Sequence, residues 1–593
     1  MTYSAPLADI ASALKHGTSL AAAIEQGLVG DIGMEDIDAI IAEAGRFAGE
    51  VIAPLNRIGD TYGATFKDGI VTTAPGWKEA YRAWRLAGWN AVTAPAEWGG
   101  QALPQVVNAA CTEMWHAASM GFANGPMLTM AAIDALHAHG SDALKRTYLE
   151  KLVSGEWMGT MQLTEPQAGS DVGALRTRAE RAGDGAYRIK GQKIFITYGE
   201  HDFTENIIHF VLARLPDAPP GTRGISLFLV PKFLLRPDGS LGARNDVRAH
   251  SVEHKLGIHG SPTCTMIFGD GGGATAFLIG EENAGMACMF TMMNRARLAV
   301  GLQGVGVAER ATQHALAYAR ERRQGRTAGM SAAQSAPIVA HPDVRRMLLT
   351  MRALTQAARA ICYATALAID RSERSDDEAA RSEANRQASL LTPVTKAFST
   401  DVGNEVASLG IQVHGGMGCI EETGAAQLFR DARIAAIYEG TNGIQAIDLV
   451  TRKLPLDGGA VAASHIDELH RVVRALDASN DPGFGWSAVR LGDAVGSLAR
   501  ATDWLLARLA KEPDAALAGA SPYLRLFGLS TGGCLLAKQA LAAMRLGEDA
   551  AGRVGLTRFF AENLAVGAGA LERTVIEAAA GVIGTDAAPL AAS

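Results

Sequence analysis

The middle of the chain, from about Gly159 to Gly280, differs from its surroundings because it is made of short strand-like segments. These segments are rich in β-branched and aromatic residues, and residues typical of turns separate them. They cover residues 187–190, 193–198, 207–212, 225–231 and 265–268. Strands this short and this closely spaced predict a small antiparallel barrel placed between two helical regions.

Both flanks of this block show the periodicity of helices. Helices are expected over much of residues 1 to about 160, with breaks at Trp98-Gly99-Gly100 and at Gly125-Pro126. After the block, apolar residues at 298, 302, 305 and 308 share one helical face, as do those within 344–358, which predicts bundle helices. His341-Pro342-Asp343 favours a helix start, since proline suits the first turn and the acid complements the helix dipole.

A further helical region follows a Pro- and Gly-containing segment at 454–460, which we interpret as a linker. Helical periodicity returns over 465–478, 489–510 and 523–546. Apolar stripes at this spacing usually mean core, so we expect an appended α-helical domain that serves packing or dimer stability.

Composition is that of a soluble globular enzyme, with 48% hydrophobic and 20% charged residues among 593. The net charge of -7 gives no general attraction for nucleic acid or acidic membranes. The six cysteines lack metal-ligand spacing, and His250 and His254 are four apart but have no adjoining acidic pattern on a helix, so no metal site is predicted. We find neither a leader-like N-terminus nor an apolar run of ~20 residues, which predicts a cytoplasmic protein without a membrane span.

The segment Ile437-Tyr438-Glu439-Gly440-Thr441 holds one carboxylate between an aromatic residue and a glycine. Desolvation raises the pKa of a buried carboxyl, which would make Glu439 a competent base toward a weakly acidic carbon-bound proton. A solvated carboxylate at a turn is the competing interpretation of this short motif.

Three other segments support a catalytic interpretation of Glu439. Residues 161–171 form a loop rich in Pro, Gly, Ser and Asp after an apolar stretch, with backbone N–H groups and hydroxyls for a planar ring or a phosphate. Residues 191–199 alternate as a half-buried strand does and present Phe195 and Thr197 on one face. Residues 254–264 lead into another short strand.

These four segments, in this order and spacing, resemble the acyl-CoA dehydrogenase flavoprotein family from about Glu35 to about Leu454. The resemblance implies an α+β multidomain fold with an N-terminal helical domain, a middle small β-barrel and a C-terminal four-helix bundle, here followed by the appended α-helical domain. The expected divisions are 1–34 as an N-terminal extension, then 35–158, 159–282, 283–454 and 455–593. The chain's start and its extra length resemble the long bacterial subgroup that includes 3-methylthiopropionyl-CoA and broad fatty acyl-CoA dehydrogenases.

The resemblance also implies FAD as cofactor, because no side chain accepts the hydride that leaves the β carbon. Leu163 and Thr164 match residues at the flavin pyrimidine edge, and Ser170 matches a serine near the flavin phosphate and the substrate pantetheine. Thr197 matches the threonine that reaches flavin N5, and Phe195 stands where many relatives have tryptophan. Thr441 is expected at the cofactor. A capped turn and a plain strand threonine are the competing interpretations of Thr164–Ser170 and of Thr197.

By the same resemblance, Glu439 removes the α-proton and its backbone N–H helps to hold the thioester carbonyl. Arg297 and Gly440 are expected at the substrate, with Asn294 where relatives often have aspartate beside the arginine. Arg322 in the charged run 318–326, and Gln412 and Gly416 in the glycine-rich segment 412–418, match positions that reach the FAD of a neighbouring subunit. A homodimer or dimer of dimers is therefore expected.

The predicted function is α,β-dehydrogenation of an acyl-CoA thioester to the trans-2-enoyl-CoA in fatty acid β-oxidation, with an electron-transfer flavoprotein as acceptor. An acyl-CoA oxidase that uses O₂ is the first alternative, since it shares the base and the flavin. A flavin-containing DNA-associated relative is the second, which the lack of a Lys/Arg stripe in 455–593 disfavours.

Overall fold

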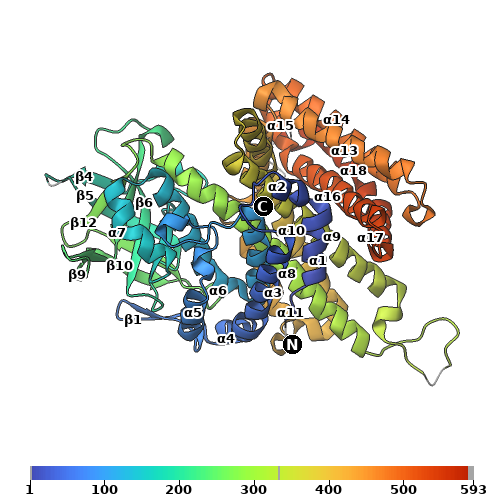
Figure 1. Ribbon diagram of the computed structural model, residues 1–593, viewed down its shortest axis with the longest axis horizontal. Helices are drawn as coiled ribbons and strands as arrows, with labels where there is room; N and C mark the ends of the chain where they lie inside the picture. The colour runs from blue at the N-terminus through green and yellow to red at the C-terminus, as the bar shows by residue number, and fades with distance from the viewer. Residues whose placement is uncertain (1–2, 184, 332–333, 585–593) are drawn as a thin grey trace.

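The computed structural model describes residues 3–183, 185–331 and 334–584. The β-rich middle lies at one end of the long axis, helices fill the centre, and the C-terminal helices cover the other side (Figure 1). Within these described ranges no helix is both long and apolar enough to cross a membrane.

The N-terminal quarter is helical apart from one small hairpin. Its elements are α1 Leu7–Ser12, α2 Leu20–Glu25, α3 Met34–Phe47, α4 Ala53–Tyr62, β1 Thr65–Lys67, β2 Ile70–Thr72, α5 Trp77–Leu86, α6 Gln105–His139 and α7 Asp142–Val153.

The long helix α6 corrects one sequence-based expectation. The break predicted at Gly125-Pro126 is wrong, because both residues lie inside the helix and the non-helical backbone is at Ser119. Proline at 126 removes the hydrogen bond that would reach the Phe122 carbonyl. The Tyr198 hydroxyl lies 3.5 Å from that carbonyl and 2.9 Å from the Gly121 carbonyl, so a side chain of the β-rich domain satisfies backbone groups at this point.

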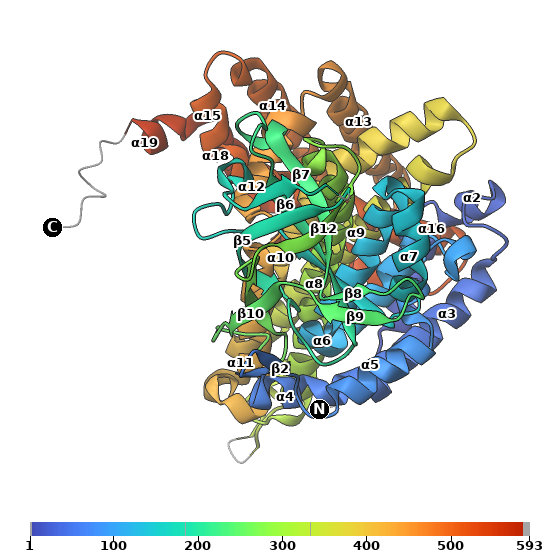
Figure 2. The same cartoon turned by 90° about the vertical axis from the view of Figure 1, so that its left-hand side faces the viewer.

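The middle domain contains a closed ring of five strands. Its elements are β3 Trp157–Gln162, β4 Arg178–Arg181, β5 Tyr187–Thr197, β6 Asn206–Arg214, β7 Ile225–Pro231, β8 Phe233–Leu235, β9 Leu241–Arg244, β10 Val247–Val252, β11 Thr263–Phe268 and β12 Ala274–Ile279. The pairings run β5–β4–β6–β7–β12 and return to β5, while β11 and β10 extend from β5 and β3 adds to β6 (Figure 2).

Two details of the predicted barrel are wrong. The strands expected at 187–190 and 193–198 are one strand, β5, because Gly191 continues the extended chain with a φ that L side chains rarely adopt. The barrel is not antiparallel throughout, since β6 pairs in parallel with β3 and β4. Sequence alternation reports which face of a strand is buried and not the direction of its neighbour.

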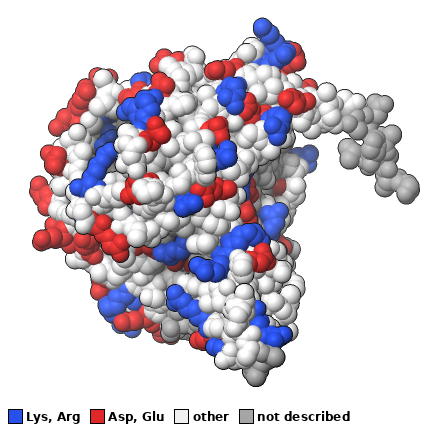
Figure 3. All heavy atoms as spheres, turned by 90° about the vertical axis from the view of Figure 1, so that its right-hand side faces the viewer, with Lys and Arg blue, Asp and Glu red and all other residues white. Residues whose placement is uncertain are grey.

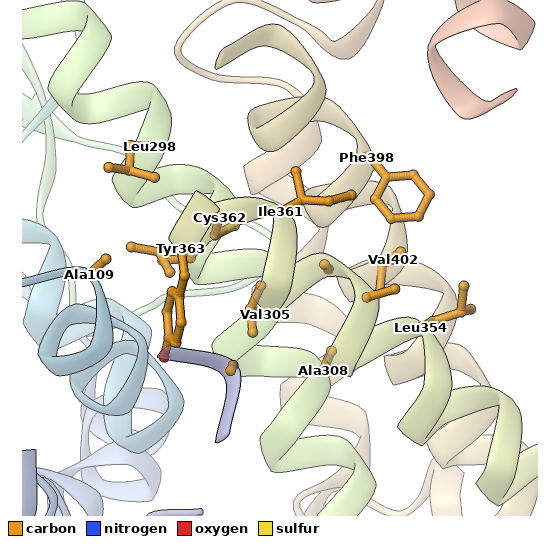
Figure 4. Close-up of a cluster of buried hydrophobic side chains, with 14 of the residues drawn as sticks. Ala109, Leu298, Val305, Ala308, Leu354, Ile361, Cys362, Tyr363, Phe398 and Val402 are labelled. Atoms are coloured by element: carbon orange, nitrogen blue, oxygen red, sulfur yellow. The ribbon is translucent and has the colours of Figure 1, made fainter. Parts of the chain in front are cut away.

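The third region is built on α8 Gly285–Glu321, α9 Pro342–Arg374 and α10 Glu378–His414, with the shorter α11 Ala425–Ala432 and α12 Asn442–Asp448. The helix start predicted at Pro342 is confirmed. Small residues let α8 and α10 approach closely, since a Cβ at Gly304 would lie 2.2 Å from the Ser399 carbonyl oxygen. Figure 4 shows the apolar layer of this region, with Val305, Ile361 and Phe398 among its side chains.

A buried ionic cluster ties α6 to this helical core. The Arg359 guanidinium contacts the carboxylates of Glu113, on α6, and Glu309, on α8, and all three side chains are excluded from solvent. The Tyr363 hydroxyl donates to Glu113 at 2.7 Å. Charges buried this deeply cost desolvation energy, so removing one partner is far more destabilising than losing a surface pair.

The appended helices are α13 Ala460–Ala478, α14 Ser487–Leu509, α15 Pro513–Ala518, α16 Ala520–Arg545, α17 Ala551–Asn563, α18 Ala568–Glu577 and α19 Ala579–Ile583. The linker expected at 454–460 is a tight 3-10 turn, Leu456–Gly459, that enters α13 directly. Helix α16 packs on the bundle, where Gly528 lies against Phe398 and Gly532 against Ala357.

The N-terminal segment holds the bundle and the appended helices together. Asp9 accepts two hydrogen bonds from Arg352 of α9, at 2.7 and 2.9 Å. Lys15 and His16 each contact Glu548 at 2.8 Å, beyond the end of α16. The segment therefore touches regions that are far apart in sequence.

Candidate active site

Glu439 lies in the turn between the 3-10 helix Arg433–Ala436 and α12, and its backbone is left-handed (φ +57°). This conformation is costly for a residue other than glycine and is often found at functional sites. Gly440 continues it with φ +84°, and a Cβ there would lie 2.7 Å from the Gln445 side-chain nitrogen. That nitrogen donates to the Glu439 carbonyl at 3.1 Å, which fixes the turn. Thr441 caps α12 by accepting from the Ile444 N–H.

The Glu439 carboxyl has the electrostatics of a base. Burial raises its pKa to about 7, while the positive charges of Arg297 and Lys396 act in the opposite direction. Its backbone N–H has no hydrogen-bond partner among the described residues. Both the proton acceptor and one amide donor are thus available to a ligand.

Lys396, on α10, is a site residue that the sequence did not indicate. Its ammonium group donates to the Gly440 carbonyl and to Asn442 Oδ1, both at 2.8 Å, and the side chain is fully buried. Burial lowers its pKa to about 7, and Glu439 is the first of the charges that oppose this. A single lysine within a long helix carries no motif, so only the fold reveals its place beside the Glu439 turn.

Tyr438 anchors the turn to the helical core on its other side. Its hydroxyl donates to Gln303 Oε1 on α8, and Gln303 Nε2 donates to Asn124 Oδ1 on α6 at 2.6 Å. Because Tyr198 at the end of β5 contacts the same stretch of α6, this helix connects the Glu439 turn to the β-rich domain. The Glu439 turn and the segment 191–199 are therefore both joined to α6.

The loop 254–264 contributes to this connection. Ile258 N–H donates to Asp431 Oδ1 at 2.5 Å, and the backbone of Gly257 lies against the Arg430 carbonyl, where a Cβ would be 2.4 Å away. The loop thus supports the segment that leads to Glu439.

Leu163 and Thr164 are held at the edge of the barrel by a buried ion pair. Lys193 and Glu165 meet at 2.8 Å, and Lys193 also donates to the Leu163 carbonyl at 2.9 Å. The Thr164 carbonyl accepts from Ile194 N–H at 2.9 Å. The charge of Lys193 and several hydrogen bonds lower the pKa of Glu165 to about 2 against the effect of burial, so its carboxylate stays ionised.

Phe195 presents an open aromatic surface beside this edge. Its side chain is 61% exposed, and its φ of +60° belongs to a bulge where β5 gains one residue on β11. Thr197 lies two residues further, half-buried and paired with Thr263. In the described structure the hydroxyls of Thr164, Ser170 and Thr197 make no hydrogen bond. An exposed ring next to unpaired hydroxyls and backbone edges fits a planar heteroaromatic ligand.

Arg297 is buried near Glu439, with its Nη1 3.4 Å from Asn294 Oδ1 and its guanidinium over the Phe290 ring. Its Nε atom is buried without a partner in the described part of the chain. The expected neighbour Asn294 is confirmed, while the nearby Asp448 was not anticipated.

Arg322, Gln412 and Gly416 lie away from this site. The ring of His414 stacks on Tyr318 at 4.4 Å, which brings the ends of α10 and α8 together. Arg322, Gln412 and Gly416 are all exposed there. Figure 1 places the loop after α8 at the opposite end of the long axis from β5. They do not complete the site built by Phe195 and Thr197 of the same chain.

A small cavity lies between α6 and α8, close to the Tyr438 network. Its volume is about 30 Å³, and Leu302 and Met127 line it. Met127 is also 3.6 Å from the Gln303 side chain that binds Tyr438. The Arg295–Asp134 ion pair, at 3.0 Å, contributes to its wall.

The described residues include no group of three or more His, Cys, Asp and Glu side chains placed to hold a metal ion. The six cysteines are unpaired, and all except Cys419 are buried.

Comparison with known proteins decides the family. Family profiles match the acyl-CoA dehydrogenase N-terminal domain at 34–156, its middle domain at 160–270 and its C-terminal domain at 283–454. The chain belongs to the acyl-CoA dehydrogenase family. A fourth profile, described as acetyl-CoA dehydrogenase C-terminal like, matches 465–586. The predicted resemblance, fold class and enzyme class are confirmed.

Among curated relatives, 3-methylmercaptopropionyl-CoA dehydrogenase of Ruegeria pomeroyi is 49% identical over 92% of both chains. The broad-specificity linear acyl-CoA dehydrogenase FadE5 of Mycobacterium tuberculosis is 33% identical, over 91% of this chain and 92% of its own. An acyl-CoA dehydrogenase from Bacillus anthracis, solved in complex with FAD, shares the fold with a TM-score of 0.74 at 21% identity. It covers 92% of this chain and 89% of its own.

Proposed function

We propose that this family member oxidises a short acyl-CoA to its trans-2-enoyl-CoA, with FAD as cofactor and Glu439 as the base. The observation that carries the proposal is the Glu439 turn, where a carboxyl with a pKa raised to about 7 stands beside an unpaired backbone N–H and two buried cations. A base with a pKa near the working pH combines a large deprotonated fraction with useful basicity.

FAD fits the residues of the barrel edge, and the FAD-bound Bacillus anthracis enzyme has the same fold. The exposed Phe195 ring would face the isoalloxazine, the hydroxyls of Thr164 and Thr197 would bond to it, and Ser170 would lie near the phosphates. When bound, FAD supplies the hydride acceptor that the chain's own side chains lack. The Lys193–Glu165 pair holds the Leu163 carbonyl and the adjoining loop in place before the cofactor arrives.

At the substrate, Glu439 would take the α-proton while its own N–H donates to the thioester carbonyl. Such a donor stabilises developing negative charge by roughly 3–4 kcal/mol. Gly440 allows the close approach of the thioester, and Thr441 caps the following helix so that the turn keeps its shape. Lys396 fixes the Gly440 carbonyl, and Arg297 balances the charge of the ionised base.

The acyl tail would enter the cavity between α6 and α8. At about 30 Å³ the cavity has room for one or two water molecules, so a tail would enter it only as side chains such as Met127 and Met130 move aside, and their sulfur atoms would offer polarisable contacts. A thioether substrate such as 3-methylthiopropionyl-CoA, named in the Ruegeria pomeroyi relative, suits this lining. A linear fatty acyl-CoA is the second candidate.

The assembly proposed is a homodimer or dimer of dimers in the cytoplasm. Arg322, Gln412 and Gly416 would complete the FAD site of a neighbouring subunit, because all three are exposed and the loop after α8, which begins at Arg322, lies at the opposite end of the long axis from β5 (Figure 1). An electron-transfer flavoprotein would accept the electrons in a β-oxidation step.

Binding of DNA is disfavoured by the surface of the appended helices. In residues 455–593 acidic side chains outnumber basic ones. Figure 3 shows Lys and Arg interspersed with Asp and Glu over the face that includes these helices. A phosphate backbone needs a continuous basic surface.

The test is steady-state oxidation of a panel of acyl-CoAs with an artificial electron acceptor. Short substrates, 3-methylthiopropionyl-CoA included, should have the highest kcat/KM, and a preference for long chains would contradict the proposed tail pocket. Peroxide release is measured against reduction of an electron-transfer flavoprotein. If peroxide accounts for most turnovers, the oxidase alternative replaces the dehydrogenase.

A further inference from the structure

A second cavity, of about 160 Å³, has neither Glu439 nor Lys396 in its lining and lies where five elements of the fold meet. Its wall is formed by residues Gly17 to Ser19, which precede α2, and by α9, α10, α13 and α16. It therefore spans the junction of the bundle, the N-terminal segment and the appended helices. A cavity of about 150 Å³ holds a molecule of benzene's size.

The wall carries more positive charge than negative. Arg371 on α9 and Lys538 on α16 line the cavity together with one acid, Glu468 on α13. Among the described residues, the side chains of these three make no direct hydrogen bond or ion pair. Arg371 Nε is buried and unpaired. Two cations facing one carboxylate leave one positive charge without a counter-charge.

A buried histidine adds a further polar group. His465 is 8% exposed, stacks on Phe527 at 5.0 Å and shares a hydrogen bond with Thr531 through Nε2. Its Nδ1 atom is buried with no partner in the described structure. Burial lowers the pKa of this ring to about 4, so it is neutral near pH 7 and leaves the charge of the wall unchanged.

Much of the remaining lining is apolar, although Thr18, Ser19, Gln387 and Thr531 also lie in it. Ile361, Leu367, Leu391, Leu469 and Val472 provide most of the apolar part. Unpaired polar groups in a cavity of this size cost stability unless a ligand or water satisfies them. A ligand with one negative charge and a short hydrocarbon part matches both portions of the wall.

We propose that this cavity is a binding site for a small carboxylate with a short apolar tail. The carboxylate lies between Arg371 and Lys538, within reach of the His465 ring, and the tail lies against Leu367, Leu391 and Val472. The site is separate from the acyl-CoA site and does not depend on Glu439.

The experiment is calorimetric titration of the FAD-loaded enzyme with butyrate in the presence of saturating crotonyl-CoA, which occupies the acyl-CoA site. Saturable binding of butyrate is expected, with butyramide at least about tenfold weaker because it lacks the charge. Inorganic phosphate, which has charge but no tail, should also bind at least about tenfold more weakly.

Two variants remove the charge and one fills the space. Arg371→Gln and Lys538→Gln should each weaken butyrate binding about tenfold or more, and Ala364→Leu should block it without a change of charge. The exposed Lys511→Gln is the matched control. FAD content and melting temperature show that each variant is folded.

The proposal is overturned if butyrate gives no saturable heat, if butyramide or phosphate binds equally well, or if crotonyl-CoA abolishes butyrate binding. Equal binding by the folded Arg371 and Lys538 variants would overturn it as well.

Discussion

Acidification should switch off the proposed base within a narrow range of pH. A general base acts only when deprotonated, and burial raises the Glu439 pKa to about 7. A group with this pKa is about 90% deprotonated at pH 8 and about 10% at pH 6, so kcat/KM should fall about tenfold between them. The direction of this change in kcat/KM follows from the group being a carboxyl, which loses its basic form as pH falls through its pKa.

Replacing Lys396 by methionine should move the midpoint of this pH profile to higher pH. The lysine charge lowers the Glu439 pKa, so its removal raises that pKa. A nearby opposite charge lowers the pKa of a carboxyl by about 1–3. Burial lowers the pKa of Lys396 itself to about 7, so its charge is only partial at neutral pH and the smaller change is expected. A midpoint near pH 8 would leave about 10% of the base active at pH 7, where the parent has half, a loss of about fivefold.

The assay is kcat/KM for the FAD-loaded enzyme over this pH range, which reports the free enzyme's essential groups. Lys511→Met, at an exposed position, is the control for loss of a lysine. A lower plateau with an unchanged midpoint would show that Lys396 only positions the Gly440 carbonyl. A flat profile between pH 6 and pH 8 in the parent enzyme would refute the raised pKa of Glu439 and the argument built on it.

Four further variants test the supporting structure and the shared site. Lys193→Met leaves the buried Glu165 carboxylate without its counter-charge, so we expect a loss of about 3–5 kcal/mol in unfolding free energy and poor FAD retention, measured by denaturant titration and flavin absorbance. Arg359→Met should cost a similar amount, whereas Arg386→Ala, in an exposed pair, should cost at most about 0.5 kcal/mol; equal costs would contradict the argument. Arg322→Gln should weaken both FAD retention and subunit association in sedimentation, and a fully loaded monomer would contradict the shared site.

The sequence was sufficient for elements whose start or end depends on local chemistry. Pro342 begins α9 as expected, and the strand expected at 225–231 is β7 with the same bounds. The helix break predicted at Pro126 was wrong, because a prediction from local sequence takes no account of the Tyr198 hydroxyl. This hydroxyl reaches the carbonyls of Gly121 and Phe122 from the β-rich domain. Local patterns report backbone preferences, and tertiary partners can override them.

The residues of the candidate site also fall into two groups, those that short motifs indicate and those that only tertiary contacts reveal. Glu439, Phe195 and Thr197 were predicted as candidates from short motifs, since a loop or strand with unusual residues marks them. Lys396 and the Gln303–Asn124 link could not be found, because each is a single polar residue within a long helix and gains its meaning from a contact across the fold. The left-handed backbone of Glu439 was equally hidden, although the glycine that follows it hints at a turn.

The most direct test of the account is anaerobic stopped-flow reduction of the Glu439→Gln variant by a short acyl-CoA. Glutamine keeps the shape of the side chain and the backbone N–H but cannot accept the α-proton. The account predicts an enzyme that keeps its yellow FAD chromophore and bleaches at least about 100-fold more slowly than the parent, the scale of a general base's contribution. Bleaching at nearly the parent rate would show that another group removes the proton.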